Sequence, residues 1–196
     1  YNVLLIADEV ATGFGRTGKM FACQHEGVTP DLMAISKGMT GGYMPLAATL
    51  ATEEIYRAFL GRYDEWKTFF HGHSYTGNPL GCALALANLD IFRREKTLAH
   101  VRKQTKLLAR LLRPMTSLSH VGEIRQCGLL VGIELVQDRT TRTPYPLEMR
   151  IGHRVAQACR KGRLLMRPLG NVIALVPPLS TSAQELTKMV AILHRA

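Results

Sequence analysis

The sequence lacks the features that mark membrane proteins and secreted disulfide-rich proteins. No apolar run among its 196 residues reaches the roughly 18 residues that a membrane-spanning helix needs. No segment combines a basic stretch, an apolar core and a small-residue cleavage site, as secretory signals do. The cysteines are scattered without a CxxC pair, so we expect free thiols and a cytoplasmic location. They are Cys23, Cys82, Cys127 and Cys159.

Clustered metal ligands are also missing. His71 and His73 form an HxH pair, but no third ligand candidate lies near them in the sequence. A zinc site needs further His, Cys or carboxylate ligands around such a pair. We therefore expect no metal.

Acidic residues are scarce: Lys and Arg number 25, Asp and Glu number 15, and the formal net charge is +10. Many of the basic residues lie in RREKTLAHVRKQTKLLARLLR (93–113), which predicts one amphipathic helix. No aromatic residues are interleaved there for base stacking. The charge therefore favours a solvated basic face that attracts anionic metabolites over a nucleic-acid partner.

Residues 3–59 alternate short apolar stretches with glycine-rich turns, a pattern typical of α/β proteins. VLLIADEV (3–10) is a continuous apolar run that ends in acids, as a buried parallel strand would. DLMAISKG (31–38) predicts a second strand, and MPLAATLATEEIYRAF (44–59) predicts a strand that leads into a helix. We therefore expect an α/β fold with a parallel sheet.

Helical patterns dominate from Asn78 onward. Residues 78–95 carry small and apolar side chains on nearly every face, which predicts a buried helix. Asn78 is its expected N-cap and Pro79 its first residue. An amphipathic stretch continues to about Arg113, and Pro114 ends it.

The remaining sequence predicts a compact α+β unit. Residues 123–138 indicate either a strand pair or one long bent strand around Gly128 and Gly132, and residues 146–162 indicate an amphipathic helix. Residues 164–179 predict a hairpin, and Ser182 with Glu185 forms the capping box of a final helix. We place the domains at 1–94 and 95–196.

An acid pair and a lysine follow the first two predicted strands. Asp8 and Glu9 end the first strand and Lys37 ends the second, so they are expected at one edge of the sheet. A partly desolvated lysine becomes a nucleophilic amine that can form a Schiff base, and an acid can hold a pyridinium nitrogen. Two plainer interpretations stay open: a helix cap or an ion pair with Arg16 for the acids, and a solvated strand end for Lys37.

ADEVATGFGRTG (7–18) followed by PDLMAISKGMTGGYMPLAATL (30–50) closely resembles the core of the class III (omega) aminotransferases. These are fold-type I enzymes that use pyridoxal 5′-phosphate. The resemblance implies that Asp8 bonds the pyridine nitrogen and that Lys37 is the catalytic residue that holds the cofactor covalently. It also implies that the chain is the C-terminal part of the large cofactor-binding domain followed by the small α+β domain.

Two further segments resemble the branch of this family that acts in biotin synthesis. FFHGHSYTGNPLGCALALANL (69–89) is similar to the segment that reaches the neighbouring subunit's site in these dimers. The resemblance implies that Gly72 contacts substrate and that His73 and Ser74 contact the cofactor phosphate, although the family often has Pro-Thr at that pair. LLMRPLGNVIALVPPL (164–179) implies that Arg167 binds the substrate carboxylate. Ala174 stands where several members have tyrosine.

The resemblance implies a homodimeric enzyme that transfers an amino group from S-adenosylmethionine to 8-amino-7-oxononanoate. It covers essentially the whole chain but less than half of a family member, so we expect the 196-residue chain alone to be inactive. Two alternatives remain: another omega-aminotransferase that uses diamines or ω-amino acids, and a non-catalytic basic module left from a degraded enzyme.

Overall fold

The structure, a computed structural model, describes residues 3–196; Tyr1 and Asn2, at the start of the first expected domain, lie outside this range. The chain divides into two compact units, Tyr1–Thr97 and Leu98–Ala196, called unit 1 and unit 2 below. No helix among the described residues is long and apolar enough to cross a membrane.

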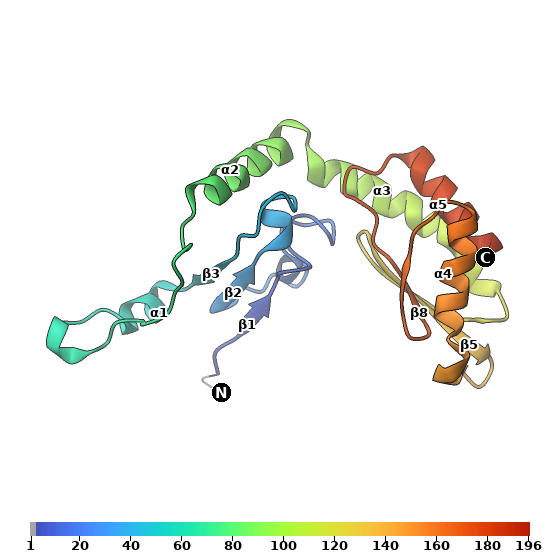
Figure 1. The fold of residues 1–196 in the computed structure, drawn as a ribbon, viewed down its shortest axis with the longest axis horizontal. Coiled ribbons are helices and arrows are strands. Elements are labelled where there is room, and N and C mark those ends of the chain that lie inside the picture. Colours follow the sequence, from blue (N-terminus) through green and yellow to red (C-terminus); the bar gives the residue numbers. More distant parts are fainter. Residues whose placement is uncertain (1–2) are drawn as a thin grey trace. The chain divides into compact units, whose positions relative to one another are not determined.

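The elements follow one another along the chain as labelled in Figure 1. Unit 1 contains β1 Ile6–Asp8, η1 Ala22–His25, β2 Leu32–Ile35, η2 Lys37–Met39, β3 Ala48–Ala51, α1 Glu53–Ala58, η3 Tyr63–Glu65 and α2 Pro79–Arg94, where η marks a 3₁₀ turn. Helix α3 Thr97–Leu112 begins at the last residue of unit 1. Unit 2 continues with η4 Arg113–Ser117, β4 Val121–Cys127, β5 Leu130–Asp138, β6 Thr143–Pro144, η5 Leu147–Met149, α4 Ile151–Lys161, β7 Arg167–Leu169, β8 Val172–Leu175 and α5 Ala183–Arg195.

Unit 1 is built on a sheet with the strand order β1-β2-β3. Strands β1 and β2 are parallel, with Asp8 opposite Ala34, as the sequence predicts. Strand β3 runs antiparallel to β2, so the expectation of an all-parallel arrangement is wrong for this strand. The physical reason is the connection: a 3₁₀ turn and a glycine-rich loop reverse the chain, whereas a parallel return usually needs a crossover helix.

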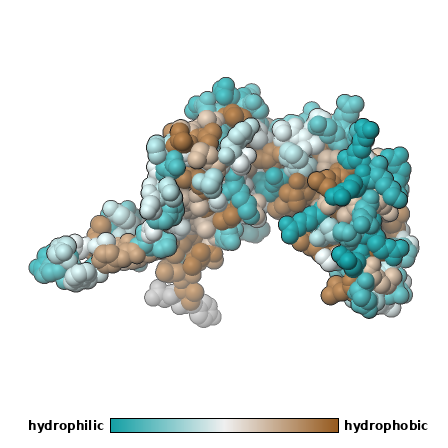
Figure 2. All heavy atoms as spheres, in the orientation of Figure 1, coloured by the Kyte–Doolittle hydropathy of each residue, from teal (hydrophilic) through white to brown (hydrophobic). Residues whose placement is uncertain are grey.

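Two elements of unit 1 are less buried than the sequence predicts. The first apolar run forms only the three-residue edge strand β1, and Ile6 is 66% exposed. Helix α2 buries only Gly81, and Leu86 is 69% exposed. Figure 2 shows hydrophobic side chains on the surface at both places. The sequence correctly predicts apolar faces, but residues 3–196 do not supply what would cover them.

Local signals set the ends of the long helices as expected. Asn78 caps α2 by accepting hydrogen bonds from the backbone of Leu80 (2.9 Å) and Gly81 (3.5 Å), and Pro79 is the first helical residue. Lys96, with φ of 51°, breaks the predicted continuous stretch into α2 and α3. Helix α3 ends at Leu112, ahead of Pro114, as expected.

Unit 2 is an antiparallel sheet with the order β4-β5-β8-β7, and β6 pairs with β5. Alternating residues of β5 and β8 are buried, among them Ile133 and Ile173, and they join side chains of α3, α4 and α5 in one continuous apolar core. Of the two alternatives for residues 123–138, the strand pair is the one observed, and the predicted hairpin and capped final helix are confirmed.

The end of α4 at Gly162 is also confirmed, but for a different reason. The glycine has φ of −82°, so no left-handed cap requires it. A Cβ at this position would lie 2.6 Å from Cγ2 of Ile192 on α5, so the missing side chain allows the two helices to pack closely.

Candidate active site

Asp8 and Lys37 lie at the carboxyl edge of the parallel pair in unit 1. Asp8 is the last residue of β1, and Lys37 follows the end of β2 by two residues. The parallel register, with Asp8 opposite Ala34, brings both residues to the same edge. One oxygen of the Asp8 carboxylate accepts a hydrogen bond from the backbone N–H of Val10 (3.0 Å), and the residue is exposed. This is the edge at which open α/β sheets bind ligands.

Lys37 has an unusual backbone conformation. Its φ of 38° lies in the left-handed region, which residues other than glycine seldom adopt. The next residue is Gly38, where an added Cβ would lie only 2.7 Å from Cβ of Phe14. The Lys37 side chain is exposed, so the desolvated setting expected from the sequence is not supplied by residues 3–196.

Glu9 differs sharply from its neighbour Asp8 because it is only 2% exposed. Its carboxylate accepts hydrogen bonds from the Thr12 hydroxyl and from the backbone N–H of Cys23 (2.8 Å). Burial raises the pKa of Glu9, but these hydrogen bonds outweigh burial and hold the pKa below its ordinary value. Glu9 therefore anchors the loop after β1, while Asp8 faces outward at the sheet edge.

Gly72, His73 and Ser74 lie in an exposed turn shortly before α2. The backbone N–H of His73 donates to Thr76 Oγ1 (3.2 Å), and the His73 ring accepts from the backbone of Tyr75 (3.1 Å). Figure 1 shows the segment between α1 and α2 projecting away from the sheet of unit 1. An added Cβ at Gly72 would meet only Thr76 Oγ1 at 3.7 Å, so local packing does not explain this glycine.

Arg167 begins β7 in unit 2 and is exposed on the face of the sheet opposite the core. It pairs with Ala174 of β8, Ala174 pairs with Gly132 of β5, and Gly132 pairs with Arg125 of β4. Directly paired residues point to the same side of a sheet, so one row carries an arginine at each end and two small residues between them.

Three residues of this row, Arg125, Gly132 and Ala174, line a shallow groove on the outer face of the sheet. The groove has a volume of about 470 Å³, and its lining includes Arg125, Gly132, Leu169, Val172 and Ala174. The Arg125 guanidinium is bound to the carboxylates of Glu134 (2.8 Å) and Glu123 (2.6 Å). Ala174, which lines this groove, is the residue that pairs with Arg167.

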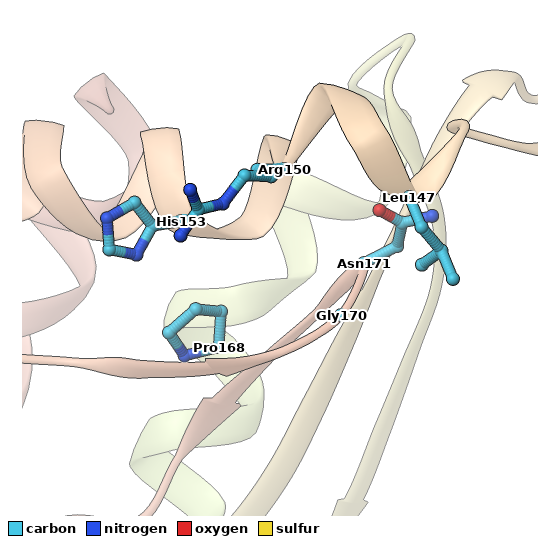
Figure 3. A pocket seen from close by; sticks show the side chains of 6 residues that line it. All are labelled: Leu147, Arg150, His153, Pro168, Gly170 and Asn171. Carbon is cyan, nitrogen blue, oxygen red and sulfur yellow. The ribbon is translucent and has the colours of Figure 1, made fainter.

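The opposite face of the β7–β8 hairpin packs against the start of α4. A hollow of about 180 Å³ lies there. Figure 3 shows its lining, with Pro168 and the hairpin turn on one side and Arg150 and His153 on the other. An added Cβ at Gly152 would lie 2.2 Å from the carbonyl oxygen of Gly170, so the helix backbone contacts the turn directly. This contact fixes the hairpin that carries Arg167.

No group of three or more His, Cys, Asp or Glu side chains in residues 3–196 could hold a metal ion, and His71 and His73 gain no further ligand. The four cysteines are free thiols, as the sequence predicts.

Two polar residues near Lys37 have roles that the sequence analysis does not predict. Glu9 is expected there only as half of an acid pair, and Asn88 is not expected there at all. Asn88 is a polar side chain within the small and apolar run 79–89, and this is the signal that could have identified it.

The whole chain, residues 1–196, matches the family model described as aminotransferase class-III. The chain belongs to the class III aminotransferases, which have the fold of type I pyridoxal phosphate enzymes and depend on that cofactor. The resemblance stated from the motifs is therefore confirmed at the level of family and fold.

The similar proteins include enzymes named adenosylmethionine-8-amino-7-oxononanoate aminotransferase. The one from Geobacter sulfurreducens is 56% identical over 190 residues, which cover 97% of this chain and 42% of that protein. The crystal structure of the one from Methanocaldococcus jannaschii superimposes with a TM-score of 0.96 at 49% identity and covers 99% of this chain and 45% of that one. An (S)-enantioselective omega-transaminase from Thermomicrobium roseum superimposes with a TM-score of 0.92 at 35% identity, over 99% of this chain and 43% of that one. The chain thus spans less than half the length of these relatives.

The residues at the edge of unit 1 fit the family cofactor chemically. A carboxylate and a primary amine follow adjacent parallel strands at one edge of the sheet. A carboxylate can pair with the pyridinium nitrogen of the cofactor, and a primary amine can react with its aldehyde. Gly38, with no room for a side chain, keeps the backbone after Lys37 close to Phe14. Asp8 and Lys37 are thus suited to hold the two ends of the reactive ring.

Proposed function

We propose that the whole protein to which this chain belongs transfers an amino group from S-adenosylmethionine to 8-amino-7-oxononanoate and forms 7,8-diaminononanoate. The observation that carries the proposal is the shared edge of β1 and β2, which presents Asp8 and Lys37 together. The choice of substrates is supported by relatives that carry these substrates in their names at 56% and 49% identity.

Asp8 and Lys37 take complementary roles in this proposal. Bound pyridoxal phosphate supplies an electron sink for the amino-bearing carbon of the substrate. The Asp8 carboxylate holds the proton on the ring nitrogen, which preserves that sink. The Lys37 amine would hold the cofactor covalently, and as a free amine it would be the base that takes the proton from the amino-bearing carbon.

The other site residues bind the substrate and the cofactor phosphate and orient them. Arg167 binds the carboxylate of the oxononanoate substrate through the planar fork of its guanidinium. The projecting turn with Gly72, His73 and Ser74 reaches the site of a second subunit, where Gly72 approaches substrate and the pair after it binds phosphate. The unexplained glycine and the exposure of the turn support this role. The protein then acts as a cytoplasmic homodimer, and the 196-residue chain alone does not transaminate.

The alternative is another class III omega-aminotransferase with a diamine or ω-amino acid donor. The likeness to the Thermomicrobium roseum enzyme and the small side chain of Ala174 in the lining of the groove favour it. A donor and acceptor panel on the full-length protein separates the two proposals. We expect diaminononanoate, detected by mass spectrometry, only when S-adenosylmethionine and 8-amino-7-oxononanoate are both present. Efficient turnover of simple ω-amino acids without that product would support the alternative.

A further inference from the structure

The strained turn at Lys37 is held by a side chain from a distant helix. Asn88 lies near the middle of α2, and its Nδ2 donates hydrogen bonds to the carbonyl oxygens of Gly38 (2.7 Å) and Met39 (3.1 Å). These are the two residues directly after Lys37, and they are about 50 positions from Asn88 in sequence. One amide group thus binds the carbonyls of two of the three residues of η2.

Asn88 lies on the face of α2 that packs against the small core of unit 1. Gly81, Ala85 and Phe92 share this face at helical spacing, and Ala85 and Phe92 pack against the buried Phe14, Ile35 and Met39. The Asn88 amide is a polar group on this otherwise apolar set, and it reaches η2 through its two hydrogen bonds. A polar residue at such a position needs partners, and Asn88 finds them in the η2 carbonyls.

The turn is also fixed from its other side. Gly38 lies against Phe14, with no room for a Cβ, and Ser36 Oγ donates to the carbonyl oxygen of Leu46 (2.8 Å). Lys37, with φ of 38°, is held between these contacts and Asn88. A residue keeps such a backbone conformation only where its surroundings determine it, and strained positions of this kind concentrate at functional sites.

We propose that Asn88 is a positioning residue for Lys37. Its two hydrogen bonds hold the left-handed turn, so that the amine stands at the carboxyl edge of β1 and β2 beside Asp8. The inference rests on the proposed function, because it matters only if Lys37 holds the cofactor. It adds a residue on α2 that touches neither substrate nor cofactor and acts through the Lys37 backbone.

The test uses full-length protein and the matched pair Asn88→Asp and Asp90→Asn. The first replaces the donating amide by a carboxylate of the same shape, which cannot donate to the two carbonyls. The second makes the reverse exchange on the same helix, where Asp90 pairs only with the exposed Arg93 and Arg94 among the described contacts. Each apo protein is mixed with pyridoxal phosphate, reduced with borohydride at timed intervals, and mapped by peptide mass for label on Lys37.

We expect Asn88→Asp to slow labelling of Lys37 by up to about 100-fold, the loss expected from a misplacement of about 1 Å, while Asp90→Asn labels at the rate of the unmodified protein. Labelling of Lys37 at the normal rate in Asn88→Asp would overturn the inference and leave the proposed function intact. If the label falls on another lysine in the unmodified protein, the proposed function fails, and the inference fails with it.

A second measurement keeps the test decisive if Asn88→Asp folds poorly. In Lys37→Ala, an added primary amine such as ethylamine takes over the task of the lysine, and the position of the Lys37 backbone no longer matters. With the added amine, the double variant Lys37→Ala/Asn88→Ala should then transaminate at the same rate as Lys37→Ala alone. A clearly lower rate in the double variant would mean that Asn88 serves the fold of unit 1 in general, which would overturn the positioning role.

Discussion

The two units of the chain differ in how they combine a core with a site. Unit 2 buries a continuous cluster contributed by three helices and the sheet, with Leu129, Ile133 and Ile173 almost fully inaccessible. Unit 1 buries a cluster of three residues, Phe14, Ile35 and Met39, and leaves many apolar side chains of α2 and the projecting segment exposed. Yet unit 1 carries Asp8, Lys37 and Gly72–Ser74.

The comparison indicates that unit 2 contributes most of the stability of the chain, whereas unit 1 carries the groups at the sheet edge. A domain is stabilised mainly by the apolar surface it removes from water, and unit 2 does this with its own residues. Unit 1 arranges functional groups at a sheet edge but has little core in these 196 residues. The chain spans less than half the length of its relatives, and many apolar side chains of unit 1 are exposed within residues 3–196.

The largest effect should come from the exposed lysine of unit 1. Lys37→Ala in the full-length protein should lower turnover by about 10²- to 10⁴-fold or more, because it removes the covalent hold on the cofactor and the proton-transferring base. The melting temperature of the apo protein should hardly change, since the side chain is exposed. Lys103→Ala, at an exposed position of α3, is the control. Normal turnover in Lys37→Ala would contradict the proposal that Lys37 holds the cofactor and transfers the proton.

The core of unit 2 should dominate the stability of the chain. Leu129→Ala should lower the free energy of unfolding by about 2–5 kcal/mol, because the side chain is fully buried. Leu86→Ala on α2, where leucine is 69% exposed, should change it by no more than about 0.5 kcal/mol. Denaturant unfolding of the 196-residue chain measures both values. Equal losses would contradict the contrast between the units.

Glycines in the two units should respond differently to an added methyl group. Gly152→Ala should destabilise unit 2 by about 1–3 kcal/mol, because the new Cβ would collide with the carbonyl oxygen of Gly170. Gly72→Ala has space and should change the unfolding free energy by no more than about 0.5 kcal/mol. Thermal melts of both variants check this. A tolerated Gly152→Ala would mean that the helix and the hairpin are not held in direct contact.

The smallest effect should be a local acid sensitivity in unit 1. The folded-state pKa of Glu9 lies below the ordinary value of 4.5, so its carboxylate stabilises the loop above that pH. The contribution is lost as the pH falls through the folded-state pKa. Hydrogen exchange at the Cys23 amide, corrected for its intrinsic rate, should report this loss. Glu9→Gln should abolish the pH step, whereas Glu26→Gln, at an exposed position, should retain it.

Sequence reasoning succeeded where the signal is local. The caps at Asn78 and Ser182 and the hairpin turn at Gly170 depend on residues within one turn of the chain, and each lies where it was expected. The shared edge of Asp8 and Lys37 was also predictable, because parallel strands align their carboxyl ends.

Predictions from the sequence were wrong or missing where the structure depends on contacts between distant segments. The antiparallel course of β3 depends on how the loop after Lys37 closes, and the hydrogen bonds of Asn88 join segments about 50 positions apart. The exposure of α2 could not be predicted either. An apolar pattern indicates which face of a helix can be buried, but it does not indicate whether another segment packs on that face. Substrate roles for Gly72, His73, Ser74 and Arg167 stay predictions.

Single-turnover kinetics of Arg167→Ala in the full-length protein test the proposed function most directly, with Arg154→Ala, at an exposed position of α4, as control. Each half-reaction is followed separately. We expect the step with 8-amino-7-oxononanoate to lose about 2–5 kcal/mol, or roughly 30- to several-thousand-fold, because its carboxylate loses its partner. The step with S-adenosylmethionine should lose much less, and Arg167→Lys should restore only part. Equal, small losses in both steps would show that Arg167 is a surface residue and would contradict the assignment to 8-amino-7-oxononanoate.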